Sequence, residues 1–261
     1  MMQLSNTTEI IIYEQPLNEV IRVCLRLEQL FTQIDHYLAS ENILDTRLVI
    51  SSIINILQLL DRPDLKAKLA KELSYHLANL MRYGHMPDID TQKLNFITSQ
   101  LENLSKHFID TSGKIGHRLR DIELLNTLRT HLSSPGGGCS FDIPLFHYWL
   151  QQPFAIRQAT INNWINDFSQ VKLAATIILD LVRNSTKVEQ KDAIHGFHQE
   201  LLDSQLNLRL IRIGIKPSIL AYPEISVGRH FLSVRFFSPD IQDHPHQYTE
   251  NVTFLLGYCH P

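Results

Sequence analysis

The chain has 261 residues, of which 44% are hydrophobic and 20% are charged, and its formal net charge is −3 at pH 7. Such a composition is typical of a globular protein with one large core or two smaller ones. The near-neutral charge excludes a general attraction to nucleic acid or to an anionic membrane, so we expect neither as a partner.

The predicted elements start with a short strand over 9–14, a run rich in isoleucine. From Leu17 to Leu38 apolar residues recur every three or four positions, which predicts a long amphipathic helix. The same periodicity predicts six further helices, each with one apolar face. They run from an Asp45 cap to Leu60, from Pro63 to a stop at Gly84, from an Asp90 cap to Phe108, from Ile115 to Leu132, over 154–167 and over 169–185.

The hydrophobic period changes near residue 190. Three runs rich in β-branched and aromatic residues, 206–215, 229–237 and 250–258, are separated by turn residues, which predicts antiparallel strands. We therefore predict an α+β fold, with a mostly helical bundle domain and a small antiparallel β-sheet domain built from the C-terminal strands and the N-terminal strand. The predicted helical domain spans 17–188, and the predicted β-sheet domain combines 1–16 with 189–261.

The cysteines and the apolar runs indicate the cytoplasm. Cys24, Cys139 and Cys259 are odd in number and far apart, which suits a reducing compartment and predicts neither a disulfide framework nor a zinc knuckle. The first 16 residues lack the basic segment of a signal peptide, and the longest apolar run, 173–182, is too short for a membrane span. We expect a cytoplasmic protein without a membrane anchor.

The segment 133–150, "SSPGGGCSFDIPLFHYWL", looks most like a site of chemistry. A phosphate-binding loop needs a lysine followed by Ser or Thr after its glycines, and neither follows Gly136–Gly138. Lys114 in "TSGKIGH" also lacks the upstream glycine and the following Ser or Thr. Neither stretch is therefore predicted to be a nucleotide loop.

Two interpretations of this segment remain at this point. A thiol- or metal-dependent enzyme would use Cys139 with His147 as its base, eight residues further along the chain. In the architectural interpretation the glycines form a turn, Asp142 caps a helix that begins at Pro144, and Cys139 is buried as a small apolar group. The spacing favours the architectural interpretation.

Thirteen histidines raise the question of a metal site. His244 and His246 flank Pro245, and His260 lies near the C-terminus. Zinc requires three or four ligands with ordered supporting partners, whereas an H-x-H pair around a proline is typical of a solvated turn. We therefore predict no metal site.

Arginines recur in the predicted strands. Strand alternation places Arg229, Phe231 and Arg235 on one face of their strand, while Arg209 and Arg212 cannot share a face of theirs. One of the latter pair must point toward the core, or a bulge must intervene. A guanidinium beside an aromatic ring on an open sheet face suits an acidic, partly apolar peptide, and a solvated sheet face is the alternative.

The segment 133–150 and several shorter runs together carry a family resemblance. The segment resembles the Ser-x-Pro-Gly-Gly-x-Cys-Ser-Phe-Asp-x-Pro-x-x-His-x-Trp-Leu signature of the ZapD family of bacterial cell-division proteins. The run "YEQPLNEVIRVCLRLE" (13–28) is similar to the start of that family's first helix. Four shorter runs fall in the family order: "LDLVRNS" (179–185), "GFHQ" (196–199), "YPEIS" (222–226) and "VRFF" (234–237). The resemblance covers nearly the whole chain.

This resemblance implies a non-enzymatic protein with no cofactor and no small-molecule substrate. Members of the family are cytoplasmic homodimers with a helical domain and a β-domain. They bind the C-terminal tail of FtsZ, the tubulin-like division protein, and cross-link and bundle its filaments, which stabilises the Z-ring at mid-cell. We expect the same function, partner and location for this chain.

The resemblance also implies which residues bind the tail. Arg235 in "VRFF" and Arg62 in "LDRPDLK" occupy arginine positions of the family, and Lys66 follows Arg62 by one turn. Where the family has an arginine four residues before Arg235, this chain has Phe231, so either Arg229 supplies the charge from the same face or the contact is lost. The expected tail-binding set is Arg62, Lys66, Arg212, Arg229, Phe231 and Arg235.

Overall fold

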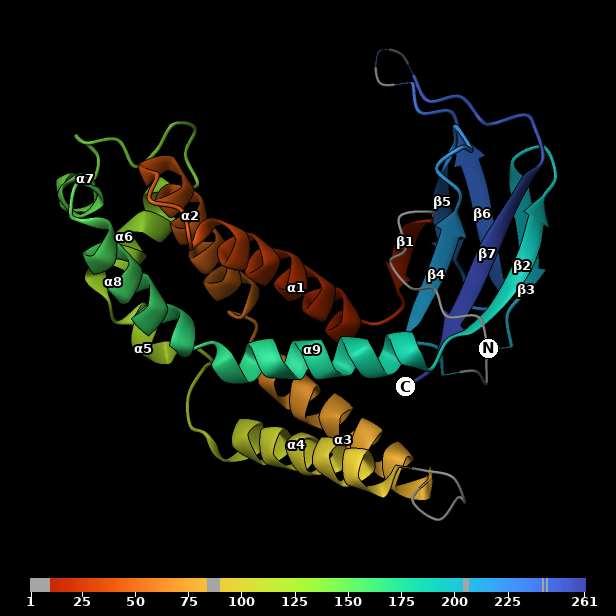
Figure 1. The fold of residues 1–261 in the computed structure, drawn as a ribbon, viewed down its shortest axis with the longest axis horizontal. Coiled ribbons are helices and arrows are strands. Elements are labelled where there is room, and N and C mark those ends of the chain that lie inside the picture. Colours follow the sequence, from red (N-terminus) through yellow and green to blue (C-terminus); the bar gives the residue numbers. More distant parts are fainter. Residues whose placement is uncertain (1–9, 84–89, 204–206, 241, 243) are drawn as a thin grey trace. The chain divides into compact units, whose positions relative to one another are not determined.

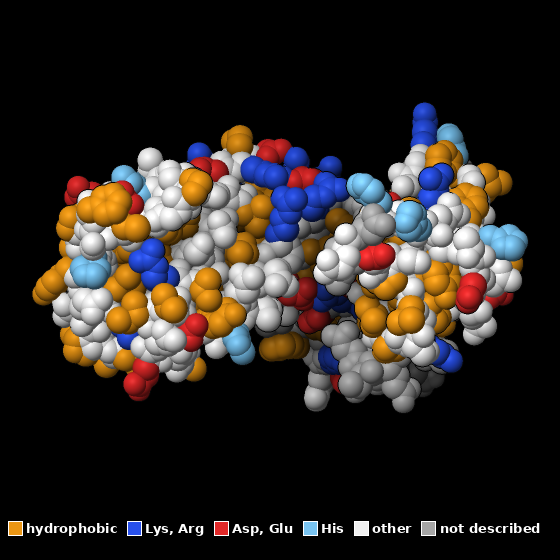
Figure 2. All heavy atoms as spheres, turned by 90° about the horizontal axis from the view of Figure 1, so that it is seen from above, with side chains coloured by type: hydrophobic (Ala, Val, Ile, Leu, Met, Phe, Trp, Pro, Cys, Tyr) orange, Lys and Arg blue, Asp and Glu red, His pale blue; other side chains and the backbone are white. Residues whose placement is uncertain are grey.

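The protein is described by a computed structural model that covers residues 10–83, 90–203, 207–240, 242 and 244–261 (Figure 1 and Figure 2). The chain divides into two compact units. Both ends of the chain, Met1–Arg22 and Leu179–Pro261, form the β unit, and Val23–Ile178 forms the helical unit. The two boundaries fall within the helices α1 (Glu19–Tyr37) and α9 (Ser169–Asn184), whereas the predicted helical domain spans 17–188.

The helical unit contains most of the amphipathic segments that the sequence predicts. Between α1 and α9 the described chain forms seven helices, which are α2 (Ile43–Leu59), α3 (Leu65–Tyr83), α4 (Thr91–Asp110), α5 (His117–Arg120), α6 (Glu123–His131), α7 (Pro144–Leu150) and α8 (Phe154–Asn166). The helices α3 and α4 lie side by side as a hairpin (Figure 1). In the core of this unit the rings of Phe31 and Phe168 meet edge to face, with 6.4 Å between their centroids. No helix in the described residues is long and apolar enough to cross a membrane.

Local hydrogen bonding corrects two helix boundaries and confirms a third. The predicted helix over 115–132 is two helices, because Ile122 adopts an extended backbone that separates α5 from α6. The cap of α2 is Asn42, whose side chain accepts a hydrogen bond from the Leu44 N–H, whereas Asp45 accepts from the Ser40 hydroxyl. Asp90 caps α4, as predicted. The expected stop at Gly84 lies outside the described residues.

The β unit contains two antiparallel sheets rather than the single small sheet that the sequence predicts. The four-stranded sheet has the order β1 (Ile11–Pro16), β4 (Leu210–Ile215), β7 (Val252–Cys259) and β2 (Lys187–Ala193). The three-stranded sheet has the order β3 (Phe197–Leu201), β6 (Phe231–Phe237) and β5 (Tyr222–Val227). The N-terminal strand returns to pair with β4, so the predicted α+β class is confirmed.

The two sheets share one hydrophobic core. Val234 and Phe236 of β6 belong to the same buried cluster as Ile213 of β4 and Phe254 of β7. The rings of Phe236 and Phe254 lie 5.3 Å apart. Because strand alternation sends every second side chain of β6 into this core, its other side chains lie on the outer face of the three-stranded sheet.

A partly buried ion network joins the first strand to the rest of the β unit. The Glu14 carboxylate on β1 accepts hydrogen bonds from the Arg183 guanidinium of α9 at 2.9 and 2.7 Å. It also lies 2.9 Å from Nε of Arg212, which is only 7% exposed. Arg212 is therefore the arginine of its run that points inward, and it is removed from the expected partner-binding surface. Arg209 precedes β4 and donates to the Asn207 side chain.

Glu14→Gln tests the strength of this network. The substitution removes the negative charge between two guanidinium groups, so we expect the free energy of unfolding to fall by about 3 kcal/mol in urea denaturation. Asp35→Asn is the matched control, because it removes a carboxylate from the more exposed ion pair with Lys172 and should cost less than about 1 kcal/mol. Equal losses for the two variants would show that the Glu14 network does not stabilise the fold.

Candidate functional site

The outer face of the three-stranded sheet is an open surface of mixed aromatic and polar character. In the strand register, Arg235 lies opposite Phe197 of β3 and Glu224 of β5. Phe231 lies opposite Leu201 of β3, near the other end of the strand. Leu201 is 88% exposed and Phe231 is 43% exposed. The sheet therefore presents an arginine and several apolar side chains on one accessible face.

Arg235 extends across this face over an aromatic ring. Its guanidinium carbon lies 5.6 Å from the centroid of the Phe197 ring. Glu224 is the directly opposite residue on β5, yet no carboxylate of the described residues lies within ion-pair distance of Arg235. The hydrogen-bond donors of the guanidinium can therefore bind a partner. The Phe197 ring beneath it restricts the conformations of the Arg235 side chain.

Phe231 is the first residue of β6, whereas Arg229 lies before the strand. The Phe231 ring covers Gly228, where an added Cβ would come within 2.9 Å of the ring. Arg229 and His230 form the connection between β5 and β6, which the Gly228 N–H closes by donating to the Phe231 carbonyl at 2.9 Å. Arg229 is thus at a hairpin tip, and the expectation that it shares the strand face with Arg235 is wrong.

The helical unit presents a second cationic surface around Arg62. A shallow groove there has Arg26 of α1 and Arg62, which follows α2, among its lining residues. The other lining residues are amides and leucines, so the groove contains no carboxylate. They are Gln29, Leu30, Asn55, Gln58 and Leu59.

Arg26 is a candidate that the sequence patterns do not single out. Arg26 lies within the run 13–28 that resembles the start of the family's first helix. It lines the groove only because α2 packs beside α1. That neighbourhood comes from tertiary packing. The described residues give Arg26 no ion pair, so its charge is available on the surface.

Asp61 neutralises the cations that lie next to this groove in sequence or in space. It accepts hydrogen bonds from Arg120 at 2.8 Å, from Arg129 at 2.7 Å and from Lys114 at 3.2 Å. Burial raises the pKa of Asp61, but the Lys114 hydrogen bond and the charges of Arg120 and Arg129 outweigh that effect and hold the pKa below its usual value. Those three cations therefore form ion pairs within the helical unit.

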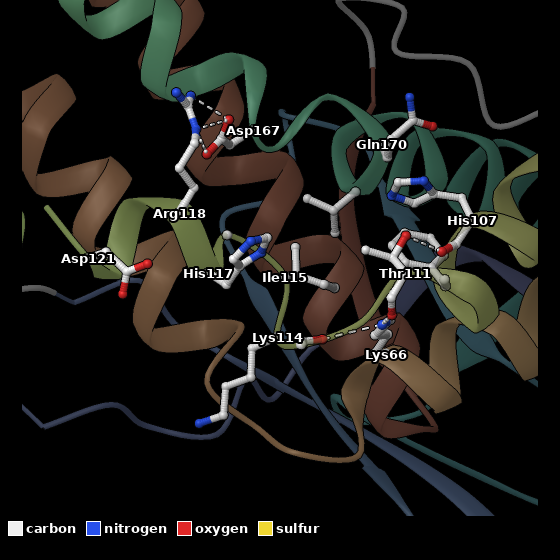
Figure 3. Close-up of a pocket in the computed structure, with 14 residues that line it drawn as sticks. Lys66, His107, Thr111, Lys114, Ile115, His117, Arg118, Asp121, Asp167 and Gln170 are labelled. Atoms are coloured by element: carbon white, nitrogen blue, oxygen red, sulfur yellow. Dashed lines mark hydrogen bonds and ion pairs between the residues drawn. The ribbon is translucent and has the colours of Figure 1, made fainter.

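Lys66, one turn after Arg62 in the sequence, lines a different hollow. The Lys66 ammonium donates to the carbonyl oxygens of Thr111 and Gly113, at the end of α4 and just beyond it (Figure 3). This hollow also contains His107 and His117.

The segment 133–150 forms a tightly bonded turn before α7. The Arg47 guanidinium donates to the Gly138 carbonyl at 3.1 Å and lies over the Phe146 ring. The Asp142 carboxylate accepts from the N–H groups of Gly138 and Cys139, so it closes the turn instead of capping α7 as expected. Pro144 begins α7, as predicted.

Cys139 and His147 do not form a catalytic pair in this arrangement. Cys139 is exposed, contrary to the expectation that it is buried, and its thiol lies 3.0 Å from the Gly136 carbonyl. Within the described residues no hydrogen bond joins it to His147, and no group of three metal-ligating side chains is present. Burial raises the pKa of the Cys259 thiol to about 11, and burial together with nearby glutamates raises that of Cys24. Neither buried thiol is therefore activated for nucleophilic attack.

The fold and these surfaces define a two-unit α+β protein that presents arginines beside apolar side chains. Comparison with known proteins narrows this class. The family described as "ZapD: Cell division protein" matches residues 25–235. A "Cell division protein ZapD" of Coxiella burnetii (strain RSA 331 / Henzerling II) is 35% identical over 251 residues, which cover 95% of this chain and 97% of that relative. The proteins of the same name from Nitrosomonas europaea and Azoarcus sp. (strain BH72) are 34% and 33% identical and cover 96% and 95% of this chain. The matched regions include 95% and 98% of the length of these two relatives.

The chain therefore belongs to the ZapD family. Its role is in cell division, and the family is not a known family of enzymes.

Two neighbouring glycines test the architectural role of the 133–150 turn. A Cβ added at Gly137 would lie 1.8 Å from the His131 carbonyl oxygen, whereas one added at Gly136 meets nothing within 4 Å and is opposed only by the positive φ of +70°. We expect Gly137→Ala to lower the free energy of unfolding by about 3 kcal/mol or more. We expect Gly136→Ala to lower it by about 1 kcal/mol. Urea denaturation measures both, and equal losses would contradict the crowding at Gly137.

Proposed function

We propose that this protein binds the C-terminal tail of FtsZ and, as a homodimer, cross-links and bundles FtsZ filaments. It would act in the cytoplasm, at the mid-cell division ring. The observation that supports this most directly is Arg235 on the open sheet face, beside exposed apolar side chains and without a carboxylate partner among the described residues. Membership of the ZapD family supports the division role within which this binding would act.

The sheet face suits an acidic, partly apolar peptide. A guanidinium can bind a carboxylate through two parallel hydrogen bonds, which are among the stronger polar contacts in proteins. Arg235 would supply these bonds, while Phe231 and Leu201 would cover the apolar side chains of the tail. Contacts of both kinds give orientation as well as affinity.

The Arg26 and Arg62 groove would accept further carboxylates of a tail. Its lining lacks acidic residues, so an anionic segment meets two arginines and no carboxylate in the groove itself. Each surface taken alone is shallow, which suits weak binding to a flexible tail that loses conformational entropy when it binds. Lys66 and Arg229 stay outside this proposed core set, because Lys66 donates to main-chain oxygens beside another hollow and Arg229 lies in the turn between β5 and β6.

Weak tail binding becomes filament cross-linking only when one particle holds two tails. A homodimer would do so, and linkage of two sites can raise apparent affinity by about 10² to 10⁴ without a new contact. Exposed apolar side chains on the 133–150 segment support self-association, since a second copy can cover them. They include Phe141 at 81%, Tyr148 at 65% and Leu145 at 58% exposure.

Arg235→Glu should weaken tail binding. In fluorescence anisotropy with a labelled FtsZ tail peptide, we expect saturable binding that weakens with salt and a dissociation constant at least about tenfold higher for the variant. Glu224→Gln should strengthen binding slightly, because it removes the carboxylate opposite Arg235. Lys216→Glu, at an exposed position just after β4, is the control for the same charge change in the same unit. Unchanged binding by Arg235→Glu would refute this site.

Mixed dimers test bivalency. Two copies with different affinity tags, one of them Arg235→Glu, can be co-expressed and purified over both tags in turn. We expect these dimers to bind one tail peptide each and to fail to bundle filaments in a light-scattering assay, while doubly tagged unmodified dimers bundle normally. Normal bundling by the mixed dimers would contradict a mechanism that needs two tails per dimer.

A further inference from the structure

The helical unit contains a hollow that the proposed tail binding does not use. Its volume is about 330 Å³, and its walls come from α3, α4, α5, α9 and the loop over 111–116 (Figure 3). This volume lies near the lower limit of known small-molecule sites. Its size therefore suits a small molecule better than a length of peptide.

The loop that forms one wall turns at two glycines. Gly113 and Gly116 have φ values of +76° and +69°, which other residues rarely adopt. A Cβ added at Gly116 would lie 3.1 Å from both Leu57 and Phe168, so the loop closes directly against the core. Gly116 therefore anchors this wall of the hollow against the core of the helical unit.

Two of the cations around the hollow are neutralised by carboxylates. Arg118 donates to Asp167 at 2.9 and 2.6 Å, and in Figure 3 it turns away from the centre of the hollow toward that residue. Lys114 extends in another direction and reaches Asp61 at 3.2 Å. Neither cation is aimed into the hollow.

Lys66 is different, because its hydrogen bonds leave its charge uncompensated. Its ammonium donates to two neutral main-chain oxygens, those of Thr111 and Gly113, the second at 3.3 Å. No carboxylate of the described residues forms an ion pair with it. Asp121, the remaining acid of the lining, points away from Lys66 in Figure 3. The hollow therefore favours an anion.

The rest of the lining combines hydrogen-bond donors with an apolar surface. The rings of His107 and His117 lie on either side of Ile115 in Figure 3, and Gln170 lies at the same end as His107. Imidazole and amide N–H groups donate to phosphate oxygens. Ile115 and Val171 supply an apolar surface between these donors.

We propose that this hollow binds a small phosphorylated molecule. The phosphate would lie near the Lys66 ammonium, which is a common phosphate-binding group, and the imidazole N–H groups would donate to its oxygens. The body of the molecule would pack against Ile115 and Val171. This is a ligand site separate from the arginine surfaces proposed for the tail, so a small molecule can occupy it without displacing a tail.

Isothermal titration calorimetry on the full chain tests the proposal. The probes are inorganic phosphate, AMP, GMP and glucose 6-phosphate. At least one phosphorylated molecule should bind with a stoichiometry of one per chain, and inorganic phosphate should compete with it. Lys66→Ala and His117→Ala should each weaken binding, the former by at least about tenfold because a charged hydrogen bond is lost. Lys71→Ala, at an exposed position on the same helix, should change nothing.

Circular dichroism and thermal unfolding serve as controls for the folding of each variant. His117 is exposed, so its substitution keeps the test valid if Lys66→Ala proves unstable. Three results would overturn the proposal: no binding of any probe at millimolar concentration, equal binding by both hollow variants and the wild type, or displacement of a bound probe by the FtsZ tail peptide. The last result would assign the hollow to the tail.

Discussion

The ion network around Glu14 is the constraint on which the β unit depends. Register places Glu14 directly opposite Arg212, and α9 supplies Arg183 from a distant part of the sequence. A shift of β1 by one residue would move Glu14 to the other face of the sheet and leave Arg212 buried without its partner, at a cost of several kcal/mol. The network therefore fixes one register for β1 against β4. The four-stranded sheet to which both belong shares its core with the three-stranded sheet.

The chain uses arginine in two opposite ways. Arg212 and Arg183 lie against carboxylates inside a unit, where their charge stabilises one arrangement of strands. Arg235 and Arg26 lie on surfaces without an acidic partner among the described residues, where the same group is free to meet a carboxylate from another molecule. Sequence spacing alone does not separate these uses, because the deciding factor is whether an acidic residue from elsewhere in the chain arrives beside the guanidinium.

Much of the fold could be predicted because amphipathic helices have a local periodicity that the sequence displays. The strands β2 and β3 could not, since "KVEQKDA" and "FHQEL" carry too few β-branched and apolar residues for a strand pattern. The second sheet depends on β3 and also on β5, whose run "YPEISV" contains a proline and was counted among the turn residues, so this sheet was not predicted either. At the candidate site, strand alternation places Phe231 and Arg235 correctly on one face, but Arg229 falls in a turn whose length no pattern specifies. The intramolecular contacts of Arg212 and Lys66 could not be predicted, because their partners are about 200 and about 45 residues away.

The β unit is assembled from both ends of the chain, with the helical unit inserted between them. The interior strand β7 pairs with both β4 and β2, and it follows all the other strands in the sequence. During synthesis on the ribosome, the helical unit can fold as soon as it emerges, whereas β1 must wait for β4 and β7, which are made much later. A chain released early would lack β7 and expose the apolar faces of its other strands, which marks incomplete molecules for chaperones and proteases before they reach a partner.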